Sequence, residues 1–147
     1  MTSTSNEPAG LISYRGSVYP RDCDHMGHIN VATYTAKFDE ASWVLFWHLG
    51  VTPSYLRGER YGMAGVQQNI SYRQELFAGD VIEVRSSVLE VADKRLRFRH
   101  DMYNLESGAL VASCELTAVH LDKVAHKACA FPAHVRAKAE AMLAGTC

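Results

Sequence analysis

One segment of the sequence is apolar on nearly every face of a predicted helix, and it limits what the chain can fold into. The residues at helical spacing over positions 31–49 are Tyr34, Phe38, Ala41, Leu45 and His48. In its second half, the other faces carry Trp43, Val44, Phe46 and Trp47. Such a helix is expected to be buried, because water would otherwise contact its apolar faces. A sheet must therefore curl around it, or a second subunit must cover what the sheet leaves open.

The remainder of the chain supplies the strands of that sheet. Alternating apolar residues predict strands over about 11–20, 66–72, 82–88, 95–103 and 110–121. Short turns, such as Gly79-Asp80 and residues 104–108, join the later strands, which should therefore pair antiparallel. Residues 50–65 are interpreted as a connector, and Pro132 is expected to open a short helix. This order predicts an α+β fold with an antiparallel β-sheet curled around a long central α-helix.

The length of 147 residues suits one domain. Residues 1–10 are small and polar and are interpreted as a flexible tail, so that residues 11–147 form the single domain. The tail lacks the apolar region of a secretory signal, and the run Trp43–Trp47 is far shorter than the roughly 20 residues that span a membrane. The four cysteines form no CxxC pair. We therefore expect a reduced, cytoplasmic protein with no membrane partner.

The charge balance argues against several partners. Fifteen Lys and Arg residues face sixteen Asp and Glu residues, which gives a formal net charge of −1. No overall field draws such a chain to nucleic acid or to an anionic membrane. One local basic strip consists of Lys94, Arg95, Arg97 and Arg99. This strip is either a solvated face of the sheet or a docking patch for phosphate groups.

The loop before the long helix concentrates polar residues. Residues 22–30 read Asp-Cys-Asp-His-Met-Gly-His-Ile-Asn, and Asn30 is predicted to cap the helix. The side chain of Asp24 is expected to be ionised at neutral pH, because an ordinary Asp has a pKa of about 3.9. The first N–H groups of a helix lack partners and carry about half a positive charge. A carboxylate and a helix start together suit attack on a reactive carbonyl.

This loop resembles the active-site segment of the 4-hydroxybenzoyl-CoA thioesterase family, which belongs to the hotdog-fold acyl-CoA thioesterases. Residues 22–30 and Tyr34 carry the resemblance, residues 68–72 and 79–84 are also similar, and about 12–122 are covered. The resemblance implies a hotdog fold and a homodimer or homotetramer with active sites at subunit interfaces. It also implies hydrolysis of a small acyl-CoA thioester to the free acid and CoA. No metal is implied, and no cofactor other than the CoA of the substrate.

The resemblance also assigns roles to individual residues. It implies that Asp24 is the catalytic carboxylate, either a nucleophile or a general base, and that the backbone N–H near Val31 polarises the thioester carbonyl. The weaker candidates for substrate contact are Asn30, His25, Gln68 and Tyr34. Lys94 matches a position that contacts the nucleotide of CoA in the family, and Arg95 follows it. The two residues before Lys94 differ from the basic residues of some members, which affects the details of CoA binding.

Most of these residues also have a purely structural interpretation. Asp22 and Asp24 can stabilise turns, Asn30 can act only as a cap, and Tyr34 can belong to an interface core. His25 and His28 can simply pack and hydrogen-bond within the loop. Glu40 lies on the predicted helix, where a related hotdog lineage has its catalytic acid. Because the Asp24 motif is present, we interpret Glu40 as a paired or partly exposed acid.

Three other functions compete with a thioesterase. His25 and His28, with acidic neighbours, have residue types that suit a metal hydrolase, although a tight loop and the absence of an HExxH helix oppose it. A non-catalytic acyl-CoA-binding hotdog protein would bind CoA esters and release no thiol. A hotdog dehydratase would need a His/Asp or His/Glu pair on its helix. The sequence is compatible with a substrate whose acyl group is aromatic, short-chain or charged.

Overall fold

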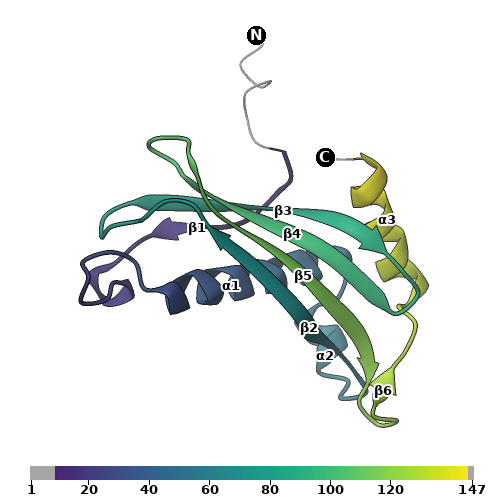
Figure 1. The fold of residues 1–147 in the computed structure, drawn as a ribbon. Helices are drawn as coiled ribbons and strands as arrows, with labels where there is room; N and C mark the ends of the chain where they lie inside the picture. The colour runs from purple at the N-terminus through teal and green to yellow at the C-terminus, as the bar shows by residue number, and fades with distance from the viewer. Residues whose placement is uncertain (1–8, 146–147) are drawn as a thin grey trace.

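A curved antiparallel sheet lies across one long helix, as Figure 1 shows. The computed structural model describes residues 9–145, so the predicted tail falls almost wholly outside the described residues. The elements in chain order are β1 (Leu11–Ser17), η2 (Pro20–Asp22), α1 (Val31–Leu49), α2 (Pro53–Leu56), β2 (Tyr61–Tyr72), β3 (Val81–Val91), β4 (Arg95–Asn104), β5 (Leu110–Asp122), β6 (Lys127–Ala128) and α3 (Ala133–Gly145). The predicted α+β architecture is confirmed.

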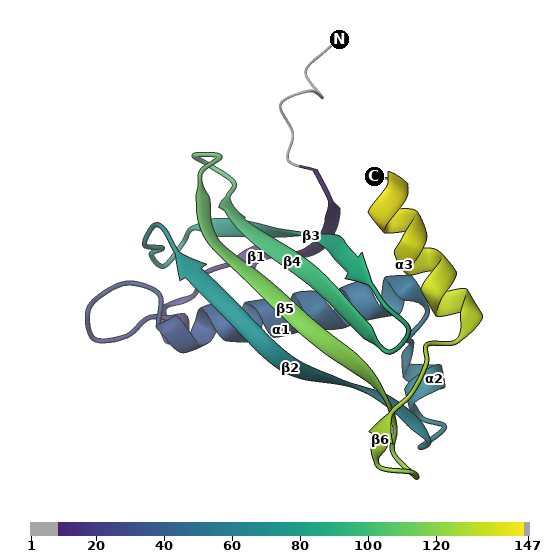
Figure 2. The same ribbon diagram turned by 45° about the vertical axis from the view of Figure 1, so that its right-hand side comes forward.

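The sheet has the spatial order β1-β3-β4-β5-β2, and every neighbouring pair is antiparallel. The short β6 pairs with the end of β5. Within the described chain β2 pairs only with β5, from Tyr61 opposite Asp122 to Tyr72 opposite Ala112. The other edge of this 12-residue strand is therefore open in a single copy. Figure 2 shows β2 at the border of the sheet, where it crosses in front of α1.

The predicted connector over residues 50–65 is wrong in two places. The short helix α2 begins after Thr52, whose side chain accepts a hydrogen bond from the N–H of Tyr55. Strand β2 begins at Tyr61 rather than at Val66. Glycines and small side chains break the apolar alternation at the start of this strand, and pairing with the distant β5 holds it extended.

The limits of α1 are those that its cap residues predict. At the start, the Asn30 side chain accepts a hydrogen bond from the N–H of Ala32 at 2.9 Å. At the end, Gly50 has a φ of 104°, in the left-handed region that favours glycine. A side chain there would also approach the ring of His134, because an added Cβ would lie 3.0 Å from its Cδ2.

The sheet covers only one side of α1. Phe38, Ala41 and Leu45 are fully buried beneath it. Two side chains that were expected to be covered are exposed: Trp47, on another face of the helix, is 60% exposed, and His48, at the end of the helically spaced stripe, is also exposed. The prediction that α1 is buried on nearly all faces is therefore wrong for one copy of the chain, because a single sheet cannot wrap around the whole helix. Within residues 9–145 no helix is both long and apolar enough to cross a membrane.

The core consists of two apolar clusters along α1, and a buried histidine lies between them. The ring of His100 stacks on Phe38 and meets Phe98 edge-on. The Ser42 hydroxyl donates to the Phe38 carbonyl, so it accepts from Nε2–H of His100, while Nδ1 accepts from the Ser86 hydroxyl. Burial lowers the pKa of His100 to about 3, so the ring is neutral at pH 7.

Candidate active site

The loop before α1 closes into a tight turn. Cys23 and Ile29 form a β-bridge across its base. The N–H of Asp24 donates to the His28 carbonyl, and the N–H of Gly27 donates to the Asp24 carbonyl, each at 3.0 Å. Gly27 has a φ of 90°, which explains why glycine stands there. This turn holds the predicted catalytic carboxylate a few residues before the helix start.

The two aspartates of this loop have different surroundings. The Asp22 carboxylate accepts the N–H of Tyr19, and its carbonyl accepts the N–H of Asn30 at 2.8 Å. Asp22 therefore supports the local backbone, as the hydrogen-bonding interpretation predicted. The half-buried Asp24 accepts the N–H of Met26 at Oδ1, at 2.9 Å. This turn role is observed, and the proposed catalytic role of Asp24 stays a prediction.

The start of α1 leaves a backbone donor at the surface. The N–H of Ala32 is held by the Asn30 side chain, and the N–H of Thr33 donates to the Asn30 carbonyl at 2.9 Å. In the contacts of residues 9–145, the N–H of Val31 has no partner of this kind. Val31 is 57% exposed. Such an N–H, at the positive end of a 19-residue helix, can donate to a developing oxyanion.

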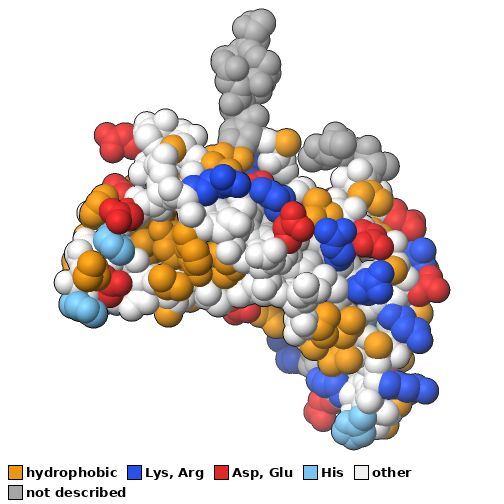
Figure 3. All heavy atoms as spheres, in the orientation of Figure 1, with side chains coloured by type: hydrophobic (Ala, Val, Ile, Leu, Met, Phe, Trp, Pro, Cys, Tyr) orange, Lys and Arg blue, Asp and Glu red, His pale blue; other side chains and the backbone are white. Residues whose placement is uncertain are grey.

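An open groove of about 600 Å³ lies at this end of α1. Val31 and Tyr34 line it from the helix, and His28 lines it from the preceding loop. The segment at the end of β2 contributes Tyr72 and Phe77, among others. In Figure 3, hydrophobic side chains gather between the end of β2 and the start of α1, with histidine and acidic side chains beside them. The structure thus brings two predicted site residues together on one concave surface.

Tyr34 is both a core residue and part of the groove wall. Only 4% of its surface is exposed, and its hydroxyl donates to the Gln74 carbonyl at 3.1 Å. Burial, aided by the nearby Tyr72 and Glu75, raises the pKa of Tyr34 to about 12. The phenol therefore stays protonated at neutral pH and cannot act as an anionic nucleophile. Its hydroxyl positions the segment that follows β2.

Other predicted contacts lie off this groove in the described chain. Asp24 and His25 precede the groove along the loop without lining it, and His25 is exposed. Gln68 is exposed on β2 and shares a face with Ile70, which packs on the core. Lys94 and Arg95 lie at the opposite end of the sheet from the groove, because Arg95 pairs with Val119 while Tyr72 pairs with Ala112.

The basic strip on β4 is largely paired with acids on the outer face of the sheet. Arg97 contacts Glu90 and Glu115, each at 3.3 Å. Arg99 contacts Glu115 at 3.1 Å and Asp101 at 2.9 Å. Figure 3 shows basic and acidic side chains interleaved on this face. These pairs favour the solvated-face interpretation for both arginines. Lys94 forms no ion pair within residues 9–145, and it stays a candidate for phosphate contact.

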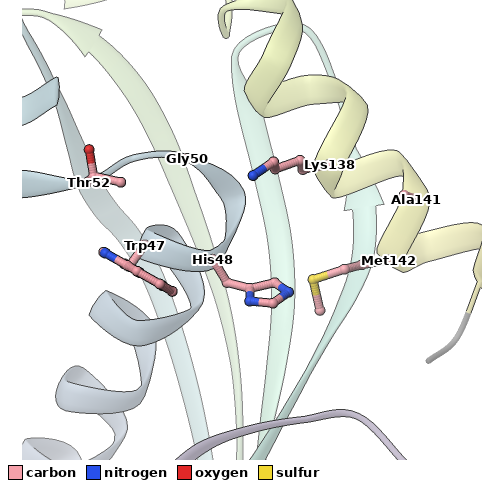
Figure 4. A pocket seen from close by; sticks show the side chains of 7 residues that line it. All are labelled: Trp47, His48, Gly50, Thr52, Lys138, Ala141 and Met142. Carbon is pink, nitrogen blue, oxygen red and sulfur yellow. The ribbon is translucent and has the colours of Figure 1, made fainter.

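A second groove, of about 570 Å³, lies between the end of α1 and α3. Figure 4 shows Trp47 and His48 facing Lys138 and Met142 across it. The described residues that line it include no carboxylate and no hydroxyl nucleophile apart from Thr52. It also lies at the far end of α1 from the Asp24 loop. This groove therefore lacks the groups that thioester hydrolysis requires.

Metal-ligating side chains do not converge in the described chain. Among residues 9–145, no group of three or more His, Cys, Asp and Glu side chains is placed to hold a metal ion. His28 approaches Glu75, with 3.6 Å between Nε2 and Oε2, whereas His25 is exposed. The HxxH spacing of the sequence thus does not produce a ligand pair here.

Comparison with known proteins identifies the family. A model of the thioesterase-like superfamily matches residues 18–139. The betainyl-CoA thioesterase of Pseudomonas aeruginosa is 26% identical over 132 residues, which are 90% of this chain and 83% of that protein. A Staphylococcus aureus protein solved with CoA has a TM-score of 0.86 at 19% identity, over 94% of this chain and 87% of its own. A gentisyl-coenzyme A thioesterase has a TM-score of 0.76 at 25% identity, over 86% and 98%.

The chain belongs to the thioesterase-like superfamily. The predicted hotdog fold is confirmed by these structural neighbours, and the predicted acyl-CoA thioesterase is confirmed as the class of enzyme. Sequence reasoning missed the part of the groove contributed by Tyr72, Glu75 and Phe77. The available signal was an aromatic and acidic cluster directly after a strand, but only the fold shows that it meets the start of α1.

Proposed function

We propose that this thioesterase hydrolyses a small acyl-CoA to the free acid and CoA at the start of α1. The observation that carries the proposal is the Val31 N–H, which is without a partner in the described chain and borders an open groove beside the Asp24 turn. Asp24 provides the carboxylate, and Val31 provides the oxyanion donor. His25, Asn30 and Gln68 are the weaker candidates for contact with substrate or water.

In the general-base route, Asp24 accepts a proton from water while the water oxygen attacks the thioester carbon. The carbonyl oxygen becomes negative and accepts the Val31 N–H. Collapse of this intermediate breaks the carbon–sulfur bond, and the CoA thiolate leaves and takes up a proton. In the nucleophilic route, Asp24 attacks the carbon itself and expels the thiolate. Water then cleaves the resulting anhydride, which regenerates the carboxylate.

The open edge of β2 supports assembly as a homodimer or homotetramer. Residues 65–69 of this strand are all exposed, and an exposed strand edge readily pairs with another chain. Pairing β2 with β2 of a second copy gives a two-fold interface. Tyr72 ends β2 and also lines the groove, so a second copy paired there borders the active site. The exposed Trp43 and Trp47 on α1 provide further apolar area for assembly.

The other features of the proposal follow from the chemistry of the substrate. Lys94 and Arg95 are proposed to contact the phosphates of CoA. Hydrolysis of an activated thioester by a carboxylate and an amide requires no cofactor other than the CoA of the substrate. The described cysteines Cys23, Cys114 and Cys129 are free thiols, which supports a reduced, cytoplasmic location.

The test is a thiol-release assay on the purified full chain, with acetyl-, benzoyl-, succinyl- and betainyl-CoA. The last is included because a relative carries that name. We expect catalytic release of CoA from at least one of these esters, and an assembly larger than one chain in light scattering. Binding of the esters without thiol release would instead favour the non-catalytic acyl-CoA-binding alternative. Single turnover in ¹⁸O-labelled water tests the nucleophilic route, because water that attacks the aspartyl carbon of the anhydride leaves label in Asp24, whereas the general-base route leaves none in the protein.

A further inference from the structure

The groove at the start of α1 presents aromatic rings to solvent. Tyr72 is 47% exposed and Phe77 is 49% exposed, although both line a concave surface. Each ring is supported from one side: Tyr72 meets Tyr34 edge-on at 5.0 Å between ring centroids, and Phe77 meets His28 edge-on at 6.4 Å. The rings are therefore held in place, and parts of their surfaces are available to a ligand.

A carboxylate lies among these rings. Glu75 lines the same groove, and its side chain is 64% exposed. Within residues 9–145, the basic group that it meets is His28, at 3.6 Å, and not a lysine or arginine. The negative charge of Glu75 also acts on Tyr34, because it contributes to raising the pKa of that phenol. The groove thus combines exposed aromatic rings with a carboxylate that forms no ion pair with a lysine or arginine among the described residues, while Arg73 also lines the groove.

We propose that this groove accepts an acyl group that ends in a quaternary ammonium, an inference that rests on the proposed thioesterase function. Aromatic faces attract such a cation, and a nearby carboxylate adds to the attraction. A quaternary ammonium has no N–H to donate, so it needs ring faces rather than hydrogen-bond acceptors. A primary ammonium would need acceptors for three N–H groups.

The proposed ammonium site and the proposed oxyanion donor share this groove. Val31, the proposed oxyanion donor, and Glu75 line one groove. We therefore expect the thioester carbonyl and the ammonium to bind within this one groove. Arg73 also lines the groove and has the opposite charge, so an anionic acyl group is the alternative that the experiment must exclude.

The experiment compares two esters of the same shape. Betainyl-CoA carries a trimethylammonium group, and 3,3-dimethylbutanoyl-CoA has a carbon atom in place of the nitrogen and no charge. The ammonium also activates the thioester chemically, so the informative quantity is the ratio of the two kcat/KM values in wild type and in variants. The difference in chemical reactivity between the two esters is the same for every enzyme variant, so it cancels when their ratios are compared.

We expect Glu75→Gln to lower this ratio by about tenfold, because the variant removes the negative charge and keeps the size of the side chain. Glu106→Gln is the matched control, because this acid lies on the exposed hairpin between β4 and β5 and should leave the ratio unchanged. Tyr72→Leu should lower the ratio, whereas Tyr72→Phe keeps the ring and should retain it. Light scattering on each variant checks that assembly is preserved.

The outcomes separate this inference from the function on which it rests. If Glu75→Gln and Tyr72→Leu leave the ratio unchanged while the wild type releases thiol, the ammonium site is wrong and the thioesterase function stands. A preference for succinyl-CoA that Arg73→Gln abolishes would likewise overturn it in favour of an anionic acyl group. If no ester in either panel releases thiol, the proposed function fails and the inference fails with it.

Discussion

Two regions along α1, the core beside its middle and the groove at its start, satisfy their polar groups in opposite ways. Around His100, in the middle of the core, both ring nitrogens are hydrogen-bonded to serine hydroxyls and the ring is packed between aromatic side chains. At the start of α1, Val31 N–H has no partner among the described residues and the Glu75 carboxylate is open to solvent. A histidine is therefore a poor guide to function here, whereas unused hydrogen-bonding capacity in a groove is a good one.

This contrast has a simple physical basis. In the described chain every fully buried side-chain nitrogen and oxygen has a hydrogen-bond partner. Leaving such a group unpaired in the interior costs about 1–3 kcal/mol, so folding removes spare donors and acceptors from the core. At a helix start water satisfies them until substrate arrives. The predictions below therefore expect changes at the groove to alter catalysis, and changes around His100 to alter stability.

The largest expected effect is on catalysis, from Asp24→Asn. The amide oxygen can still accept the Met26 N–H, so the turn and the fold are retained, while the negative charge is lost. We expect kcat to fall by about 10²–10⁴-fold with an unchanged melting temperature, measured by thiol release and circular dichroism. Asp22→Asn is the matched control and should keep activity, since an amide can replace its bond from Tyr19. Full activity in Asp24→Asn would remove the proposed mechanism.

His100→Ala should give the largest loss of stability. The substitution opens a cavity against Phe38 and Phe98 and removes one partner each from Ser42 and Ser86. We expect the free energy of unfolding to fall by about 3–4 kcal/mol in urea denaturation. Because His100 is fully buried and is not among the described residues that line the groove, kcat per folded molecule should stay within about twofold. A selective loss of kcat would show that this histidine takes part in the reaction.

Acid should destabilise the protein through the same residue. Burial lowers the pKa of His100 to about 3, whereas an unfolded histidine titrates near 6.5. The unfolded chain therefore binds more protons as the pH falls from about 6.5 towards 3, and the free energy of unfolding decreases by up to about 1.4 kcal/mol per pH unit. Burial lowers the pKa of His120 as well, with the same sign. Urea denaturation at several pH values between 7 and 5 gives the free energy of unfolding as a function of pH. In His100→Gln this free energy should decrease less steeply with falling pH than in the wild type. An equally steep decrease would show that His100 does not cause the acid destabilisation.

A smaller effect is expected at the helix cap. Asn30→Ala removes the acceptor for the Ala32 N–H and should lower the free energy of unfolding by about 1 kcal/mol. Asn30→Asp keeps an acceptor and should retain stability. The pair also sharpens the assignment of Asn30: if its only role is that of a cap, kcat of the Asp variant will match the wild type. A lower kcat with full stability would indicate contact with substrate or water.

The smallest effect should come from the CoA end of the substrate. Replacing Lys94 and Arg95 by Gln should raise KM for acyl-CoA about two- to fivefold and leave kcat unchanged, because exposed charge pairs contribute little. The corresponding N-acetylcysteamine thioester lacks the nucleotide, so its KM should not respond. A loss of kcat alone, or an equal effect on the short thioester, would place these residues elsewhere in the mechanism.

Local signals were enough to predict much of this fold. The limits of α1 depend on Asn30 and Gly50, whose side-chain chemistry and backbone freedom act within one turn of the helix, and the predicted helix over residues 31–49 has these limits. The start of β2 was not, because Gly62, Ala64 and Gly65 have no strand pattern of their own and rely on pairing with β5. Long-range pairing of this kind leaves little trace in a short window of sequence.

The candidate site was predictable only in part, for a related reason. Asp24 and Val31 lie within eight residues of each other, so a local motif can indicate both. Tyr72 and Glu75 reach the same groove from some forty residues further along the chain. Their meeting with the helix start depends on how the sheet curves over α1. Only the structure therefore shows that Tyr72 and Glu75 lie near the start of α1.

Because Val31 and Leu49 belong to one unbroken helix of 19 residues, the reactive end is tied to a rod about 27 Å long. The far half of that rod is anchored by Leu45 and Leu49 among the side chains of the second apolar cluster. The Val31 amide at the start of the helix is therefore held in place by packing at the other end, away from the groove. Side chains on the rim of the groove can vary without loosening that anchorage, so one scaffold can adopt new acyl preferences while its reaction stays the same.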